Sequence, residues 1–347
     1  YVLTPDPDHK GHLALILVGD DELALARDGK TKELVAKLGL VNDLTRPPLG
    51  TADVINDIVA IPVKTATNKQ ATTIAIPRDT TFVRLAEKQI VSVDLRALVD
   101  LPVEIIALHK NDLATIDLQP LAKIATLKTL SLDNNPLTSI DLQPLAGLRN
   151  FAQLTLNHTP QRGPIDLSPL AKTAIELLNL CSTGIPSVDL RPLAGTPIER
   201  LYIAEDQLTQ IDLTPLAKCK KLRQLSLQKN PLTTLDLAPL AACKQLERLE
   251  IGGTAITAID LAPLAGLAEL EELYLYENRL ATLDLSPLAK ATKLDNLDLE
   301  TNGFKELDLT PLLDLPIRRF VVSPDVKLSA RGKKRDLRFT RAEIRWY

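Results

Sequence analysis

Residues 127–148 read LKTLSLDNNPLTSIDLQPLAGL, and variants of this phrase recur along most of the chain. An Asp-Leu pair begins the second half of each copy, and successive Asp residues are 23 to 25 positions apart. The ten Asp residues are Asp94, Asp117, Asp141, Asp166, Asp189, Asp212, Asp236, Asp260, Asp284 and Asp308. A unit of this length cannot bury its apolar face alone, so neighbouring units must stack around one continuous core. The repeat therefore predicts a solenoid.

The first half of each unit has the pattern of a strand followed by a turn. Leu130 and Leu132 are two positions apart, so both side chains point to one face of an extended strand. The amide of Asn135 offers a donor and an acceptor to backbone groups that a bend leaves outside the sheet. The position of Asn135, here called the asparagine rung, holds a small polar residue in nine units: Asn111, Asn135, Thr159, Thr183, Asp206, Asn230, Thr254, Asn278 and Asn302. We expect these residues to stack along the turn.

The second half of each unit has the pattern of a short helix. In the phrase DLQPLA at residues 141–146, Asp is a favoured helix cap and Pro is tolerated in the first turn, where its missing N–H has no intrahelical partner. A column of ten carboxylates is also compatible with a ladder of bound cations. Because no second acidic column accompanies it, we expect helix caps and no metal.

These motifs carry a resemblance to a known family. The spacing L-x-x-L-x-L-x-x-N-x-L is that of leucine-rich repeats. The phrase at residues 140–146, IDLQPLA, resembles the D-I-x-P-L-x-x-L phrase of internalin-like bacterial repeats, with the unit lengthened to about 24 residues. The resemblance covers roughly residues 82–322. It implies an α/β solenoid, a curved array with a parallel concave sheet, short convex helices and terminal caps. It implies no catalytic residues, since the family binds many unrelated partners and shares none.

The chain divides into three segments by the extent of the repeat. Residues 1–80 break the period and are expected to form an α/β cap or a small domain. Residues 81–322 form the solenoid, with about eleven strands. Residues 323–347 are expected to form a basic C-terminal cap, because a solenoid end exposes core and needs a cover.

Within the first segment, we predict strands at residues 13–18, 55–63 and 72–76 and a short helix at residues 31–38. Pro62 and Pro77 place the last two strands at an edge or an end.

Charge is distributed unevenly. Residues 325–347 hold eight Lys or Arg against three Asp or Glu, a balance of +5, whereas residues 81–324 hold 24 against 30, a balance of -6. The basic run Lys333-Lys334-Arg335 is typical of segments that bind nucleic acid or anionic membranes. No supporting motif accompanies it, so we expect no nucleic-acid partner. No stretch of about 18 uninterrupted apolar residues predicts a membrane span.

Signatures of catalysis are missing from the sequence. It contains no phosphate-binding loop, no G-x-G-x-x-G, no H-E-x-x-H and no G-x-S-x-G. Cys219 and Cys243 occupy an apolar helix position, where we expect buried reduced thiols, and a disulfide or metal pair stays open. Unpaired cysteines favour a cytoplasmic location slightly, and secretion stays open. We expect no cofactor, no metal and no enzymatic activity.

The side chains that alternate with the buried leucines tile the concave face. Three of the five tyrosines in the chain, Tyr202, Tyr274 and Tyr276, fall in these columns with several acids around them. Aromatic residues on a solvated sheet are candidate binding hot spots. The predicted site consists of Tyr202, Glu250, Glu272, Tyr274, Tyr276, Glu277, Asp298 and Glu300. The alternative is that tyrosine has good strand propensity and the charges are a solvated surface.

The sequence as a whole predicts a non-catalytic scaffold that binds a protein or peptide, with basic character expected from the acids of the site. Two other functions stay open: an enzyme or effector whose activity lies in residues 1–80, and a structural or surface-assembly protein. The repeats do not identify the partner or the oligomeric state, because specificity lies in variable surface positions.

Overall fold

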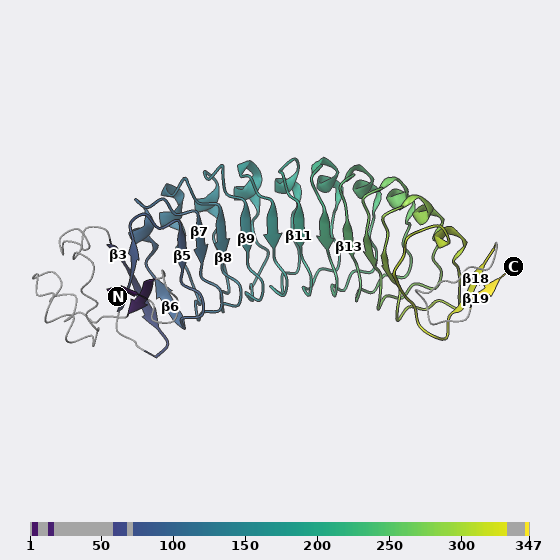
Figure 1. Ribbon diagram of the computed structural model, residues 1–347, viewed down its shortest axis with the longest axis horizontal. Coiled ribbons are helices and arrows are strands. Elements are labelled where there is room, and N and C mark those ends of the chain that lie inside the picture. Colours follow the sequence, from purple (N-terminus) through teal and green to yellow (C-terminus); the bar gives the residue numbers. More distant parts are fainter. Residues whose placement is uncertain (1, 6–12, 17–57, 68–71, 332–343, 347) are drawn as a thin grey trace, which may run out of the picture.

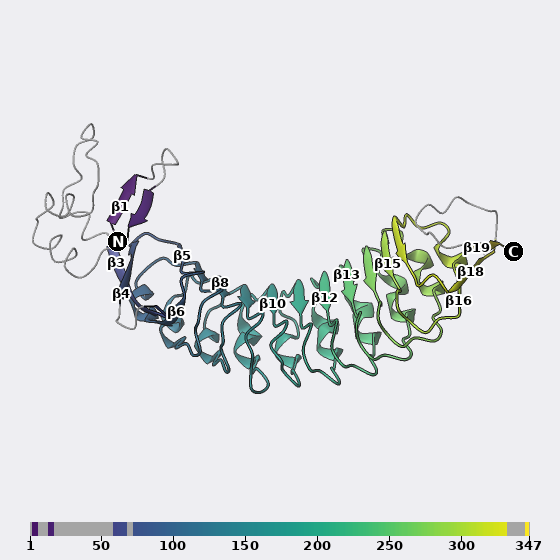
Figure 2. The same ribbon diagram turned by 90° about the horizontal axis from the view of Figure 1, so that it is seen from below.

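A computed structural model describes residues 2–5, 13–16, 58–67, 72–331 and 344–346. The helix predicted at residues 31–38 lies outside this part. The repeats form a curved solenoid with a small sheet near each end (Figure 1). Figure 2 shows the strands along the inner side of the arc and the helical turns along the outer side. No helix in the described ranges is long and apolar enough to cross a membrane.

The concave side is an eleven-stranded parallel sheet, which confirms the expected number of strands. Its strands are β5 (Phe82–Arg84), β7 (Ile105–Ala107), β8 (Thr129–Ser131), β9 (Gln153–Thr155), β10 (Leu177–Asn179), β11 (Arg200–Tyr202), β12 (Gln224–Ser226), β13 (Arg248–Glu250), β14 (Glu272–Tyr274), β15 (Asn296–Asp298) and β17 (Arg319–Val321). The central residue of each strand is buried in the core, as Leu130 and Leu273 are. The first and third residues of each strand therefore project from the concave face.

The asparagine rung joins neighbouring units as its position predicts. Asn135 Nδ2 donates to the carbonyl of Leu132 in its own unit at 2.8 Å and to that of Leu108 in the preceding unit at 2.9 Å. Its Oδ1 accepts from the backbone N–H of Leu113 at 3.1 Å. Each amide thus satisfies backbone groups that the turn removes from the sheet.

The convex side carries short 3-10 helices rather than α-helices. They are η1 (Leu95–Leu98), η2 (Gln119–Lys123), η3 (Gln143–Leu145), η4 (Ser168–Lys172), η5 (Arg191–Leu193), η6 (Thr214–Lys218), η7 (Ala238–Ala242), η8 (Ala262–Gly266), η9 (Ser286–Lys290) and η10 (Thr310–Leu312). A segment of three to five residues is too short for a ladder of i to i+4 bonds, which favours the tighter helix.

All ten repeat Asp residues cap these helices through one contact. In each unit Asp Oδ1 accepts from the backbone N–H two residues later, at 2.8 to 3.0 Å. Asp212, for example, accepts from Thr214, the first residue of η6, at 2.8 Å. From η2 onward a leucine stands between the Asp and the helix, so the cap acts one residue earlier than a standard N-cap.

The N-terminal sheet has the order β4-β3-β6. It consists of β3 (Ile58–Thr65), β4 (Thr72–Pro77) and β6 (Ile90–Val93), and a separate pair joins β1 (Val2–Pro5) to β2 (Leu13–Ile16). Pro77 lies on an edge strand, whereas Pro62 lies on β3, the central strand of this sheet at the N-terminal end of the solenoid. Pairing with β6 begins only at Val63, so the missing N–H of Pro62 interrupts no registered pair on that side.

The C-terminal end carries a second parallel sheet of three strands, β16 (Glu306–Asp308), β18 (Lys327–Ala330) and β19 (Ile344–Trp346). Residues 344–346 form β19, which pairs in parallel with β18. Cys219 and Cys243 are buried free thiols that donate to the carbonyls of Leu193 at 3.1 Å and Leu216 at 3.3 Å, as expected of small core residues.

Candidate functional site

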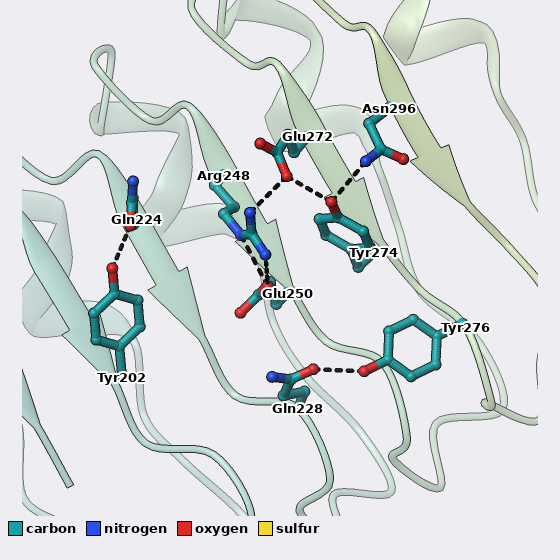
Figure 3. A network of polar contacts seen from close by, with 9 residues as sticks. All are labelled: Tyr202, Gln224, Gln228, Arg248, Glu250, Glu272, Tyr274, Tyr276 and Asn296. Carbon is teal, nitrogen blue, oxygen red and sulfur yellow. Dashed lines mark hydrogen bonds and ion pairs between the residues drawn. The ribbon is translucent and has the colours of Figure 1, made fainter. Parts of the chain in front are cut away.

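The three tyrosines of the predicted site lie on the concave face over β11 to β14 (Figure 3). Tyr202 ends β11, Tyr274 ends β14, and Tyr276 follows β14 two residues later. All three rings are half-buried. We call this surface the concave patch, defined by Tyr202, Glu250, Glu272, Tyr274, Tyr276, Glu277, Asp298 and Glu300.

The Tyr274 hydroxyl is held between two polar groups. It donates to Glu272 Oε2 at 2.5 Å and accepts from Asn296 Nδ2 at 2.6 Å. Burial and the Glu272 carboxylate raise the pKa of Tyr274 to about 12. The Arg248 guanidinium carbon lies 4.9 Å from the ring centroid, within the range of a cation–π contact. The ring is therefore fixed at its hydroxyl and supported at its face.

Arg248 joins two carboxylates of the concave patch (Figure 3). Its Nε and Nη2 donate to Glu250 Oε1 at 2.8 and 2.5 Å, and its Nη1 donates to Glu272 Oε2 at 2.7 Å. The Glu250 side chain is 10% exposed, and that of Arg248 is 37% exposed. One guanidinium thus compensates a buried and a half-buried acid, so neither presents a free charge to a partner.

Tyr276 extends across the sheet toward an earlier strand. Its hydroxyl donates to Gln228 Oε1 at 2.5 Å, although Gln228 precedes it by 48 residues. The ring passes over Gly252, where a Cβ atom would lie only 2.5 Å from Tyr276 Cε1. Burial raises the pKa of this phenol. The absence of a side chain at residue 252 therefore permits the position of the ring.

Tyr202 is oriented by a similar contact, since its hydroxyl donates to Gln224 Oε1. In the register of the sheet, Tyr202, Ser226, Glu250 and Tyr274 occupy equivalent positions on four successive strands. Ser226 is the buried member of this row, and its hydroxyl has no partner among the described residues.

The remaining acids of the concave patch differ in exposure. Asp298 is buried and lies 3.6 Å from Arg319 Nη2. Glu277 and Glu300 are exposed, and neither side chain forms an ion pair within the described ranges. The free negative charge of the patch is therefore concentrated at these two residues, at its C-terminal side.

Sequence reasoning missed Arg248, Gln224 and Asn296. All three occupy the first position of their strands, which alternation places on the same face as the third. Of the predicted site residues, only Glu272 occupies this first position. Reading this additional column would have revealed the arginine among the acids.

The N-terminal half of the concave face has a different character. Phe82 and Ile105 pair in register and are 50% and 37% exposed. Nearby, Ser131 Oγ lies 3.2 Å from His109 Nδ1 and donates to Asp133 at 3.0 Å. In the described part of the chain, no group of three or more His, Cys, Asp or Glu residues is arranged to hold a metal ion.

Comparisons with known proteins place the fold. The leucine-rich-repeat family profile matches residues 126–148. Among solved structures, internalin F of Listeria monocytogenes is 28% identical, with a TM-score of 0.60 over 74% of this chain and 72% of that one. The functional domain of internalin J of Listeria monocytogenes, which includes a cysteine ladder, is 22% identical, with a TM-score of 0.57 over 76% of this chain and 52% of that one.

A more distant neighbour is a plant peptide hormone receptor, RGFR1, in complex with RGF2. It is 17% identical, with a TM-score of 0.54 over 67% of this chain and 42% of that one. The chain thus spans about half of the solved functional domain of internalin J and less of the receptor chain. No curated protein sequence matches the chain.

Proposed function

Because the chain is a leucine-rich-repeat protein that resembles internalins, we propose that it binds a protein or peptide without catalysing a reaction, through the concave patch. The observation that carries this proposal is the fixed orientation of all three concave tyrosines by hydrogen bonds from their own hydroxyls. The solved complex of the similar plant receptor agrees with a binding role for this fold.

Fixed rings favour binding for an energetic reason. A side chain that is immobilised on association costs about 0.5–1.5 kcal/mol, and a ring that is already held avoids most of this cost. Tyr274 is held at its hydroxyl by Glu272 and Asn296. Half-buried tyrosines also offer a partner both apolar area and a polar edge. The patch therefore presents a surface that is ordered before a partner arrives.

The charges of the patch indicate what this partner offers. Because Arg248 compensates Glu250 and Glu272, the acids left for a partner are Glu277 and Glu300. A basic group placed beside the rings would pair with them. We infer a partner segment that combines an apolar surface with at least one Lys or Arg.

A selection from displayed peptides tests this function. Random 12-residue peptides displayed on yeast are enriched on the whole chain and then measured against Tyr274→Ala/Tyr276→Ala. We expect the double change to weaken binding by about tenfold or more, since hot-spot residues contribute about 2 kcal/mol or more each. The matched control is Gln143→Ala/Arg149→Ala, on the exposed convex side.

Circular dichroism melting should show that both variants are folded, because neither change removes a core leucine. Binders that ignore the tyrosine change, or a library that yields no binder, would refute the proposal.

A further inference from the structure

A second charge on the concave face selects a second charged group on the partner. Three arginines occupy the first strand position in this half of the sheet, namely Arg200, Arg248 and Arg319. Arg248 is paired with two carboxylates, and Arg319 lies 3.6 Å from Asp298. Arg200 is half-buried and forms no ion pair with any residue that the structure describes. Of these three arginines, Arg200 is thus the one without an ion pair in the described part of the chain.

The neighbours of Arg200 do not compensate its charge. In register it stands between Leu177 on β10 and Gln224 on β12. The Oε1 atom of Gln224 is already engaged by the Tyr202 hydroxyl. The carboxylate of the preceding residue, Glu199, forms no ion pair with it either. A half-buried guanidinium flanked by an apolar side chain attracts an anion more strongly than a solvated one does, because the local dielectric constant is lower.

The opposite charge lies at the other end of the patch. Glu277 follows β14 and Glu300 follows β15, three and four strands away from Arg200. With about 4.8 Å between strands and about 3.3 Å per residue along them, either carboxylate lies about 20 Å from Arg200 along a diagonal. An extended peptide covers that distance in about six to seven residues. The diagonal passes over Ser226, beside Tyr202, and then over the ring of Tyr276, which covers Gly252.

We propose that the partner is an extended segment with an acidic residue and a basic residue about six to seven positions apart. The acidic group binds Arg200, the basic group binds Glu277 and Glu300, and the residues between them contact Tyr202 and Tyr276. This inference rests on the proposed function, and it adds the charges of the bound segment and their spacing. A segment with two acidic or two basic residues at these positions would place like charges together at one end, which disfavours it.

The experiment compares peptides enriched from the yeast-displayed 12-residue library on three forms of the whole chain. The wild type should enrich an acidic and a basic residue at the stated spacing, in either order along the peptide. Arg200→Glu should enrich peptides in which a basic residue replaces the acidic one. Glu277→Lys/Glu300→Lys should enrich peptides in which an acidic residue replaces the basic one.

Affinities of the wild-type peptides provide a second readout. Arg200→Gln should weaken binding by about tenfold or more, because it removes a charge-assisted hydrogen bond to the partner. Arg200→Lys keeps the charge and should lose less, while Arg149→Gln on the exposed convex side should change nothing.

The two proposals fail in different ways. Peptides that depend on Tyr274 and Tyr276 but lack the spaced pair, or that bind Arg200→Gln as tightly as the wild type, would overturn this inference and leave the proposed function standing. Peptides indifferent to the tyrosines would overturn both.

Discussion

The ring of Tyr276 lies directly over Gly252, and this contact leaves no room for a methyl group. A Cβ at residue 252 would come within 2.5 to 2.7 Å of three ring atoms. Because the Tyr276 hydroxyl reaches Gln228 by crossing this glycine, the identity of one small residue determines where the ring rests. The ring is the far end of a flexible side chain, so it can move away while the backbone stays in place.

The change Gly252→Ala should therefore displace Tyr276 and break its bond to Gln228. We expect a loss of about 0.5–1.5 kcal/mol in the free energy of unfolding, the usual net contribution of one hydrogen bond. Denaturant melts measure this loss, and the tyrosine signal in near-UV circular dichroism reports the displacement. Gly147→Ala is the control, because nothing lies within 4 Å of its added methyl. In a Tyr276→Ala background the cost of Gly252→Ala should disappear, and a cost that persists there would place the strain elsewhere.

Asp206 is the one carboxylate at the turn position that Asn or Thr occupies in the other units. Only one of its two oxygens has a hydrogen-bond donor in the described part of the chain. Asp206 Oδ1 accepts from the backbone N–H groups of Thr183 and Gly184 at 2.8 and 2.7 Å. Its Oδ2 is buried without a partner among the described residues. At the equivalent place in the next unit, Asn230 Nδ2 donates to two carbonyls at 2.7 and 3.0 Å. Burial raises the pKa of Asp206 above its ordinary value of 3.8, although its hydrogen bonds oppose the shift.

We predict that Asp206→Asn stabilises the solenoid at neutral pH, by about 1 kcal/mol or more, because the amide supplies the missing donor. A raised folded-state pKa means that the wild type has its full stability below pH 3.8 and loses part of it as the pH rises through the folded pKa. The advantage of the variant should therefore grow with pH over that window. Melting temperatures of both proteins from pH 3 to pH 8 measure it, and a constant difference would contradict the assignment.

Asp212 titrates in the opposite sense, as a helix cap. Hydrogen bonds from the Thr214 side chain and backbone lower the pKa of Asp212 below its ordinary value of 3.8. Its contribution is thus present above pH 3.8 and is lost as the pH falls through the folded pKa. Asp212→Ala should lower the melting temperature at pH 7, with a difference that narrows in acid, whereas Asp212→Asn keeps the acceptor and should cost less. The control is Gln210→Ala at an exposed neighbouring position, and equal losses for Ala and Asn would argue against capping.

The features that recur in every repeat could be predicted from the sequence, whereas contacts between residues of different repeats could not. The leucine positions, the asparagine rung and the capping Asp residues recur at one spacing, so each copy supports the assignment of the others. The central position of β3 depends on pairing with β6, a strand that lies inside the repeat region. No local signal at Pro62 reports that partner.

The candidate site shows the same division. Alternation along the strands is enough to place Tyr274 and Tyr276 on the concave face from the sequence alone. The contact of Tyr276 with Gln228 spans two units and depends on a rotamer and on Gly252, so it is not encoded in either unit alone. Likewise, the sequence predicts an acidic patch, and the compensation of its acids becomes visible only when Arg248 is placed between Glu250 and Glu272.

That placement gives the last prediction, which concerns Arg248 as a structural partner of the tyrosine surface. Arg248→Met keeps much of the apolar length of the side chain but removes every donor from Glu250, whose side chain is only 10% exposed. An uncompensated buried carboxylate costs more than the pair contributes, so we expect a loss of about 1–3 kcal/mol in the free energy of unfolding. Adding Glu250→Gln should recover most of that loss, because the buried charge is then gone.

The control is Arg223→Met, which breaks a more solvated pair with Glu247 at 2.6 Å, where the side chains are 50% and 23% exposed. Surface pairs of this kind contribute about 0–1 kcal/mol, so the control should lose much less. Denaturant melts of the four proteins distinguish the two cases. Equal losses at Arg248 and Arg223, or no recovery with Glu250→Gln, would mean that Arg248 does not stabilise the charge of Glu250. In that event Glu250 and Glu272 would both be available to a basic partner, and the concave patch would carry more negative charge than the present geometry assigns to it.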